Sequence, residues 1–234
     1  MNTGNHRGWD GNTLKWIALL SMLIDHIGVI YLSYGSHALL SVYSLSRYIG
    51  RLSFPLFCFL LVEGFYHTGD LCKYVQRMLG FAFLAEIPYD LAIYGKIVKL
   101  DGQNVLFTFV IGLLVMWMLT KVELWSIPMY GIVLFGCAAA YLLRVDYSWY
   151  GILLIVVFYV FHDQKTKRNL AAAVLLFWQP ASLVALLCIQ WYNGERGRGN
   201  RTVFYWFYPV HLLILYALPV SYTHLRAHET SQDL

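Results

Sequence analysis

The sequence predicts an all-α protein, built as a polytopic transmembrane helix bundle with about eight spanning helices. Hydrophobic residues make up 59% of the 234 positions and charged residues 13%, whereas a soluble domain carries about 45–50% and roughly 25%. Aromatic residues reach 17% and many fall near the ends of the apolar segments, as they do at membrane interfaces. The formal net charge of +4 is mild, so no nucleic-acid partner is expected.

Eight apolar segments approach the length of about 20 residues that a spanning helix needs. The second is short and is expected to extend upstream through Arg47, and the short sixth is expected to be tilted or partly re-entrant. Because the connections are short and no repeat is visible, residues 1–220 are expected to form one domain. The segments are Leu14–Tyr34, Leu52–Tyr66, Tyr74–Tyr94, Asn104–Thr120, Ile127–Leu143, Ser148–Phe161, Leu170–Ile189 and Val203–Val220.

The two ends of the chain differ from these apolar segments. Residues 1–13 are polar, and the apolar run after them is longer than the roughly 7–15 residues of a signal-peptide core and lacks a small-residue cleavage site. This run is therefore expected to stay as the first membrane helix. Residues 221–234 are polar and lack helical periodicity, so they are expected to form a disordered tail of non-native origin. His224 and His228 are left out of the candidate site for this reason.

The cations do not set an orientation under the positive-inside rule. Counted across eight spans, eight Lys and Arg residues fall on the N-terminal side and eight on the other. The cluster at Lys165–Arg168 favours a cytoplasmic N-terminus. The small-residue face at Gly131–Gly136 fits packing within one chain or between two, so no oligomeric state is predicted.

Metal and disulfide chemistry is not expected. The cysteines show no CxxC or ligand-like spacing, and most lie in apolar runs, where a free thiol behaves as a small hydrophobe. The HExxH pattern of zinc proteases is also missing from the sequence. The cysteines are Cys58, Cys72, Cys137 and Cys188.

The first helix carries Asp25 and His26 near its centre. Ionisable groups at membrane depth cost about 2.5–3.5 kcal/mol each and tend to mark function. Consecutive helical residues diverge by about 100°, so each of the two needs a partner on another helix. They form either a hydrogen-bonded structural pair or a functional one. In the functional interpretation His26 is a general base or an acyl relay, because an imidazole titrates near physiological pH.

The second helix offers two pairs of residues at a spacing of four, which places each pair on one helical face. Arg47 and Arg51 form either a fork for phosphate or carboxylate or an interfacial anchor. In the other pair, Glu63 either fixes the tautomer of His67 or pairs with an arginine. Pro55 is expected to kink or to start this helix.

The third helix adds Glu86 and Asp90, again four residues apart, with Arg77 upstream of them. Unpaired carboxylates at this depth are protonated or bound to cations. Ion pairs with Arg47, Arg51 or Arg77 are therefore expected.

Two polar residues in the later helices extend this pattern. Asn104 opens the fourth helix and is expected to cap it. His211 follows Pro209 in the last helix, and it is either a satisfied structural residue or part of the same cavity. The pattern predicts a polar cavity built by the first three helices and completed by the last.

Six blocks of sequence resemble the TraX family of membrane proteins in residues, order and spacing. The resemblance covers nearly the whole chain apart from its ends, and IDHIG, GRLSFPLF and AEIPYDLA are its most specific parts. The blocks are LKWIALLSMLIDHIG (14–28), RYIGRLSFPLFCFLLVEGFYHT (47–68), YVQRMLGFAFLAEIPYDLA (74–92), NVLFTF (104–109), YNGERG (192–197) and FYPVHLL (207–213).

The resemblance implies transfer of an acetyl group from acetyl-CoA, as co-substrate, to an acceptor amine or hydroxyl. The family is named for a conjugative-plasmid protein that acetylates the N-terminus of pilin, so the implied acceptor is a peptide N-terminus or a small amine. A multi-pass protein of the bacterial cytoplasmic membrane is implied as well. The implied roles are catalysis for His26 with Asp25, Glu63 and Glu86, acetyl-CoA binding for Arg47, Arg51 and Arg77, and acceptor binding for His67, Asp90, Asn104 and His211.

Two other functions stay open. Arginine and acid pairs inside a membrane also suit a transporter or binding protein for a small anionic solute, although no inverted repeat is visible. An intramembrane hydrolase or metalloprotease is the third interpretation, with the acids and histidines of the first three helices as metal ligands.

Overall fold

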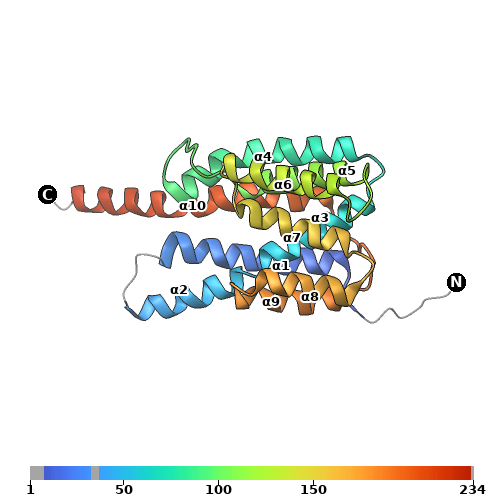
Figure 1. Cartoon of the computed structure of the whole chain (residues 1–234). Helices are drawn as coiled ribbons and strands as arrows, with labels where there is room; N and C mark the ends of the chain where they lie inside the picture. The colour runs from blue at the N-terminus through green and yellow to red at the C-terminus, as the bar shows by residue number, and fades with distance from the viewer. Residues whose placement is uncertain (1–7, 33–36, 233–234) are drawn as a thin grey trace.

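The computed structural model describes the backbone of residues 8–32 and 37–232, and the side chains of residues 8–32, 40–200 and 202–218. Within these ranges the chain is helical, with two isolated β-bridges and no strand, which confirms the predicted all-α class. Figure 1 shows the helices lying roughly along one common direction. The elements are α1 (Gly11–Ile27), the π-helical turn η1 (Gly28–Leu32), α2 (His37–Gly50), α3 (Ser53–Tyr66), α4 (Leu71–Tyr94), α5 (Val105–Leu119), α6 (Ile127–Leu142), α7 (Ser148–Val160), α8 (Lys165–Leu176), the 3-10 turn η2 (Pro180–Ser182), α9 (Leu183–Gln190) and α10 (Arg201–Gln232).

Side-chain caps fix where several helices begin. Asp10 and Asp70 accept hydrogen bonds from backbone N–H groups in the first turns of α1 and α4, at 2.7 and 3.0 Å. Asn104 caps α5 in the same way at 3.0 Å, which confirms its predicted capping role. Pro55 lies in the first turn of α3, where its missing N–H breaks no helical hydrogen bond. It therefore starts this helix.

Helices α2 and α3 together form the second pass of the chain. α2 ends at Gly50, the chain turns at Arg51 and Leu52, and α3 begins at Ser53. The predicted extension of the second helix through Arg47 is thus confirmed, with a break that places Arg51 between two helices.

The described residues pass along the bundle seven times. We call the end where α1 begins, which contains Trp9, Trp191 and Tyr159, the N-terminal end, and the opposite end, which contains Gln103 and Arg144, the far end. Backbone hydrogen bonds join Trp9 to Trp191 at the first end and Gln103 to Arg144 at the second, at 2.9 and 3.0 Å. The seven passes are α1, α2 with α3, α4, α5, α6, α7 and α10.

Helices α8 and α9 form a hairpin that enters from the N-terminal end and returns to it. Asn169, near the start of α8, donates to the side chain of Gln190 at the end of α9, at 2.7 Å. Between them, Ser182 in η2 donates to the carbonyl oxygen of Arg51, at 3.0 Å. The prediction of one spanning helix over Leu170–Ile189 is therefore wrong. Pro180 lacks the N–H that a continuous helix needs, and the chain turns back there.

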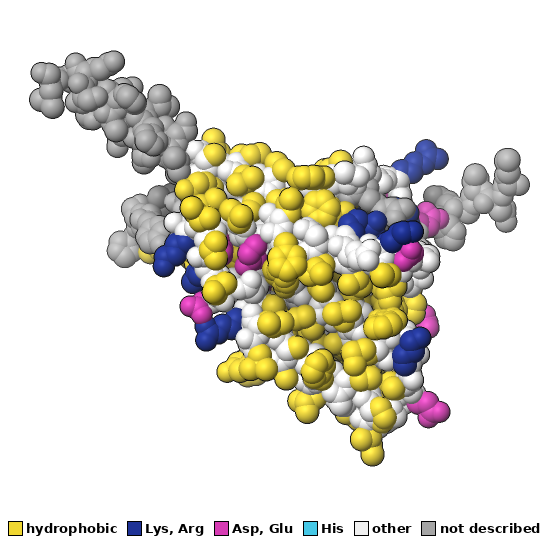
Figure 2. Space-filling model, turned by 90° about the horizontal axis from the view of Figure 1, so that it is seen from above, with side chains coloured by type: hydrophobic (Ala, Val, Ile, Leu, Met, Phe, Trp, Pro, Cys, Tyr) yellow, Lys and Arg dark blue, Asp and Glu magenta, His cyan; other side chains and the backbone are white. Residues whose placement is uncertain are grey.

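Apolar side chains cover much of the outside of the bundle. Two helical stretches of the described chain are long and apolar enough to cross a membrane, Gly11–Leu32 with 22 residues and Leu40–Tyr66 with 27. Figure 2 shows one face largely covered by hydrophobic side chains, with the charged side chains mostly toward its two sides. Such surfaces include Ile127 and Leu134 of α6 and Phe177 and Trp178 between α8 and η2, which are 71–87% exposed. A soluble protein rarely exposes large contiguous apolar surfaces.

The last helix is longer than the sequence predicted. Its end was expected near Val220, whereas α10 continues to Gln232. Residues 221–232 contain neither Gly nor Pro, and adding residues to an existing helix costs far less than starting a new one. The non-native origin of this segment stays a prediction.

The α8–α9 hairpin can be tested by labelling single cysteines with a membrane-impermeant thiol reagent. In a protein whose exposed Cys72 is replaced by Ser, Asp163→Cys and Arg198→Cys are expected to react from the same side of the membrane, because both positions lie at the N-terminal end. Lys96→Cys, at the far end, is the control for the other side. Reaction of the Cys at 198 from the side of the Cys at 96 would mean that the segment spans the membrane.

Candidate functional site

An ion pair joins α1 to α2 deep in the bundle. Arg47 Nη1 lies 2.6 Å from Asp25 Oδ2, and both side chains are largely shielded from solvent. Gly50 makes this contact possible, because a Cβ atom there would lie 2.1 Å from Asp25 Oδ1. The same Oδ1 atom is buried without a hydrogen-bond partner among the described residues. Asp25 therefore has unused capacity to accept a hydrogen bond.

His26 meets His211 of α10. His26 Nδ1 lies 2.7 Å from His211 Nε2, and the rings stack at a centroid distance of 5.0 Å. His211 Nδ1 lies 2.7 Å from the carbonyl oxygen of Phe207, which accepts hydrogen bonds but cannot donate them. When both rings are neutral, His211 therefore carries its proton on Nδ1, and His26 donates from Nδ1 to His211. This leaves a lone pair on His26 Nε2, as a base or nucleophile requires.

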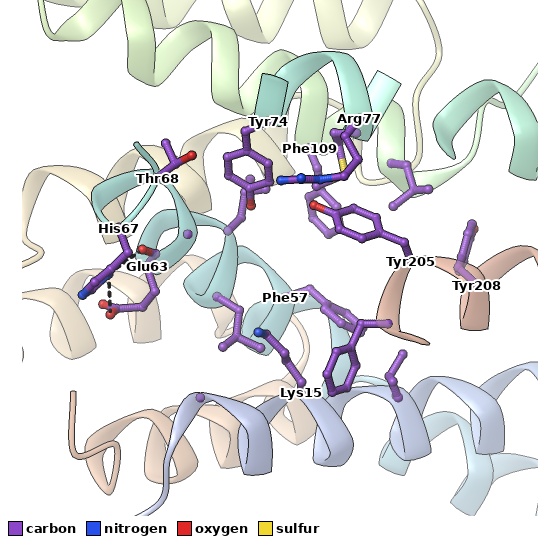
Figure 3. A pocket seen from close by; sticks show the side chains of 18 of the residues that line it. Lys15, Phe57, Glu63, His67, Thr68, Tyr74, Arg77, Phe109, Tyr205 and Tyr208 are labelled. Carbon is purple, nitrogen blue, oxygen red and sulfur yellow. Dashed lines mark hydrogen bonds and ion pairs between the residues drawn. The ribbon is translucent and has the colours of Figure 1, made fainter. Parts of the chain in front are cut away.

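A cavity of about 450 Å³ leads from the N-terminal end toward this histidine pair. Its deep part is lined by Met22 and Tyr208, and the ring of Tyr208 lies 6.4 Å from that of His26. Met22 is one helical turn before His26. Figure 3 shows Lys15 of α1 and Arg77 of α4 approaching the cavity from opposite sides. The cavity thus joins a cationic entrance to a deep wall that contacts His26 through Tyr208.

The entrance is built by the loop between α9 and α10 wrapping around the start of α1. Gly11 N donates to Glu195 O at 2.7 Å. Gly197 lies so close to Asp10 that a Cβ atom would come within 2.2 Å of its carboxylate, and its φ of 71° also favours glycine. This loop places Arg196 at the cavity entrance with Lys15 and Arg77.

Arg77 is held by aromatic rings. Its guanidinium lies 5.3 Å from the centroid of Tyr205 and 5.7 Å from that of Tyr74, within the range of cation–π attraction. Its Nε atom has no hydrogen-bond partner among the described residues. An anion in the cavity would supply that partner.

Glu63 forms a separate polar cluster at the N-terminal end. Its Oε1 accepts from His162 Nε2 at 2.8 Å and its Oε2 from the hydroxyl of Tyr192 at 3.0 Å. His67 Nδ1 lies 2.8 Å from the backbone oxygen of Glu63 and 3.9 Å from its carboxylate. The carboxylate of Glu63 therefore contacts His162 and does not orient His67, contrary to one of the two expectations. The hydrogen bond that His162 donates to Glu63 raises the pKa of His162.

Within the part of the chain that the structure describes, the carboxylates of α4 are not paired with arginines, which corrects that prediction. Glu86 accepts from both the side chain and the backbone of Asn104, and Asp90 accepts from Lys99 N at 2.6 Å. These contacts tie the far end of α4 to the α4–α5 connection. Backbone donors serve these acids because this connection folds back onto α4 before α5 begins.

The predicted site residues fall into three groups. Asp25, His26, Arg47 and His211 come together, and the geometric prediction that Asp25 and His26 find partners on different helices is confirmed. Glu63 and His67 lie at the N-terminal end, and Glu86, Asp90 and Asn104 brace α4. Contrary to expectation, His211, rather than Asp25, Glu63 or Glu86, orients His26. Arg77 lines the cavity, whereas Arg47 and Arg51 do not.

Sequence reasoning missed three residues of the site. Tyr208 and Arg196 lie within FYPVHLL and YNGERG, the blocks that carry the family resemblance, and this was an available signal. Asp146 lies in the α6–α7 connection, and its charge interacts with those of Arg47 and Arg51. A carboxylate in the short connection after a long apolar run was its only signal. Among the described residues, no three His, Cys, Asp or Glu side chains are grouped closely enough to hold a metal ion.

These features define an all-helical, membrane-associated protein with a deep histidine pair and a cationic cavity. The chain belongs to the TraX family, because the family model described as TraX protein matches residues 10–219. It is also 30% identical to the probable fimbrial assembly protein FimC, serogroup H1, of Dichelobacter nodosus, over 86% of this chain and 92% of that protein. No solved structure matches the chain.

Replacing Gly50 with Ala tests the packing that supports the ion pair. The added methyl group is expected to displace Asp25 and to lower the free energy of unfolding by about 2 kcal/mol. Gly80→Ala is the matched control, since a Cβ atom there meets nothing within 4 Å, and Ala in an exposed helix stabilises by about 1 kcal/mol relative to Gly. Thermal unfolding in detergent would measure both. Equal effects of the two substitutions would contradict the close approach of Gly50 and Asp25.

The contact between His162 and Glu63 predicts a pH dependence of stability. Because the folded pKa of His162 is raised, its contribution is fully present below the unfolded pKa of about 6.5. The contribution is lost as the pH rises through the folded value. The difference in melting temperature between wild type and His162→Gln should therefore be largest near pH 6 and shrink toward pH 9. His67→Gln is the control, since His67 is mostly exposed. A difference that grows with pH would refute the assignment.

Proposed function

We propose that this protein is a membrane-embedded acetyltransferase that moves an acetyl group from acetyl-CoA to an acceptor amine. The observation that carries the proposal is the cationic cavity that ends beside the His26–His211 pair. Acetyl-CoA would supply an activated thioester and a polyanionic nucleotide. The chain offers cations at one end of the cavity and a basic imidazole nitrogen beyond the other.

The re-entrant hairpin supports a cytoplasmic N-terminal end. Because α8 and α9 return to that end, Arg196, Arg198 and Arg201 lie there too. The balance of cations between the two ends changes from eight against eight to eleven against five, counted along the sequence. Under the positive-inside rule the N-terminal end then faces the cytoplasm, where acetyl-CoA is made. This favours a multi-pass protein of the bacterial inner membrane with a cytoplasmic cavity entrance.

Lys15, Arg77 and Arg196 would hold the phosphates of acetyl-CoA. A guanidinium donates two parallel hydrogen bonds to phosphate, and the unpartnered Nε of Arg77 fits such a role. Apolar side chains, including Phe57 and Leu106, line the deeper cavity and suit the arm that carries the thioester. Arg47 and Arg51, which the family resemblance assigned to the co-substrate, instead serve the polar groups around Asp25.

His26 would act through Nε2. Its Nδ1–H is held by His211, so the ring is fixed in orientation and tautomer, as a catalytic imidazole requires. Nε2 either takes a proton from the attacking acceptor or attacks the thioester itself and carries the acetyl group. In both cases His211 shares the positive charge that develops on His26, and Phe207 O holds His211 in place.

The similarity to a probable fimbrial assembly protein suggests the acceptor. A pilus or fimbrial subunit exposes a free N-terminal amine after its leader is removed, and acetylation of such an amine removes its positive charge. We therefore favour a peptide N-terminus over a hydroxyl compound as the acceptor.

Two groups of variants should distinguish acetyl-CoA binding from acetyl transfer. Arg77→Gln and Arg196→Gln are each expected to raise the Kd for acetyl-CoA about tenfold, the loss of roughly 1.5 kcal/mol from one charge-assisted contact. Arg144→Gln, at the far end, is the charge-matched control and should bind normally. His26→Ala should bind acetyl-CoA like wild type but transfer no acetyl group to a peptide amine. Calorimetric titration and a radiolabelled transfer assay measure the two effects. Full transfer by His26→Ala, or normal binding by both arginine variants, would refute the proposal.

A further inference from the structure

The connection between α6 and α7 is a strained loop held in a fixed shape. Arg144, Tyr147 and Ser148 have φ angles of 52°, 61° and 43°, a region that residues other than glycine rarely occupy. Three such residues within five positions cost several kcal/mol and persist only where the surroundings enforce them. Strain of this kind concentrates at functional sites.

Contacts from two helices and a neighbouring loop enforce this shape. Gln103 forms a β-bridge with the loop, accepting from Asp146 N at 2.9 Å and donating to Arg144 O at 3.0 Å. The hydroxyl of Thr108 donates to Asp146 O. On the other side the ring of Tyr147 stacks on Phe54 of α3, at a centroid distance of 3.5 Å. The backbone on both sides of the Asp146 side chain is thereby fixed.

The loop presents the Asp146 carboxylate to the polar groups around His26. The cations that act on it are Arg51 and Arg47, and Asp25 is the acid that acts on it. The charge of Asp146 also interacts electrostatically with three tyrosines. They are Tyr89 of α4, Tyr147 of its own loop and Tyr208 of α10. Tyr208 lines the deep end of the cavity, and its ring lies 6.4 Å from that of His26. Asp146 thus lies among the charged groups around Asp25, which it reaches from the α6–α7 connection and not from the cavity entrance.

The lengths of the helices explain how a loop residue reaches this depth. α7 has 13 residues and α5 has 15, so they are about 20 and 22 Å long. The stretch from Gly11 to Leu32 has 22 residues and is about 33 Å long. The α6–α7 connection therefore lies short of the far end of α1, near the level of Asp25 and His26.

We propose that Asp146 is the catalytic residue that accepts the proton of the acceptor's ammonium group, with the acceptor arriving from the far end. The inference rests on the proposed acetyltransferase function and adds to it the residue and the side for the acceptor. A carboxylate attracts an ammonium group, whereas acetyl-CoA, a polyanion, is directed to the cationic entrance.

The step balances without a further reactant. A peptide amine arrives at neutral pH as R–NH3+, whose nitrogen has no lone pair for attack. One N–H bond breaks and an O–H bond forms on Asp146, which gives R–NH2 and a neutral carboxylic acid. The amine then attacks the acetyl carbonyl carbon. The bond from that carbon to its leaving group, the CoA sulfur in direct transfer or His26 Nε2 in the relay, breaks, and His26 Nε2 takes the second proton from the amine nitrogen. The positive charges of Arg51 and Arg47 act on Asp146 and favour its ionised form, which is the form that can take a proton.

The test measures acetyl transfer to a peptide N-terminus by full-length wild type, Asp146→Asn and Asp146→Glu between pH 5 and 9. Asp101→Asn is the control, since Asp101 is an exposed far-end acid paired with Arg144. At pH 7, Asp146→Asn should lower kcat/KM about 100-fold, and Asp146→Glu should recover part of it. An α-amino group has a pKa of about 8, so roughly tenfold more acceptor is neutral at pH 9 than at pH 7. The defect should shrink by about that factor.

A neutral nucleophile separates proton transfer from folding. Hydroxylamine is uncharged at pH 7, so Asp146→Asn should acetylate it at nearly the wild-type rate, with unchanged acetyl-CoA binding. An Asp146→Asn defect that is the same for both acceptors and at every pH would overturn the proposal, as would normal peptide transfer at pH 7. Wild type that transfers acetyl to neither acceptor would instead overturn the acetyltransferase function itself.

Discussion

Burying Asp25 in an apolar bundle is the constraint on which the rest of the site depends. An ionised carboxylate inside a low-dielectric bundle needs a cation in contact with it, and Arg47 supplies one because Gly50 leaves room for the approach. Since adjacent helical residues point about 100° apart, directing Asp25 toward α2 turns His26 toward α10. There His211 completes the pair. One ion pair therefore sets both the α1–α2 packing and the orientation of the imidazole.

The two ends of the bundle offer different chemistry to the same histidine. Lys15, Arg77 and Arg196 gather at the entrance of the cavity, while Asp146 reaches the polar groups around His26 from the opposite connection. An anionic donor and a cationic acceptor would therefore approach from opposite ends. This separation depends on the α8–α9 hairpin. Six passes bring the chain back to the N-terminal end, and the hairpin returns it there before the seventh pass, so the loop of Arg196 lies at the same end as the start of α1.

The sequence predicted which residues lie inside the membrane better than it predicted which side chains they contact. The lengths of the apolar segments and the capping residues predicted the positions of most helices. The free-energy cost of burying ionisable groups in a membrane predicted that Asp25 and His26 need partners. The hairpin was missed because Leu170–Ile189 has the length of a span, although Gln179 and Pro180 interrupt it near the middle. The sequence also did not predict which residues the α4 carboxylates contact. Glu86 met the side chain and backbone of Asn104, rather than an arginine, because the α4–α5 connection folds back onto α4, and such a fold has no periodic signal in the sequence.

Transfer across a sealed bilayer tests the central claim most directly. Proteoliposomes would receive radiolabelled acetyl-CoA outside only, with a membrane-impermeant peptide amine either inside only or outside only. The account predicts labelled peptide only when the peptide is inside, whatever the mixture of protein orientations, because donor and acceptor reach His26 from opposite ends. Labelled peptide formed when both substrates are outside, with none formed when they are separated, would contradict it.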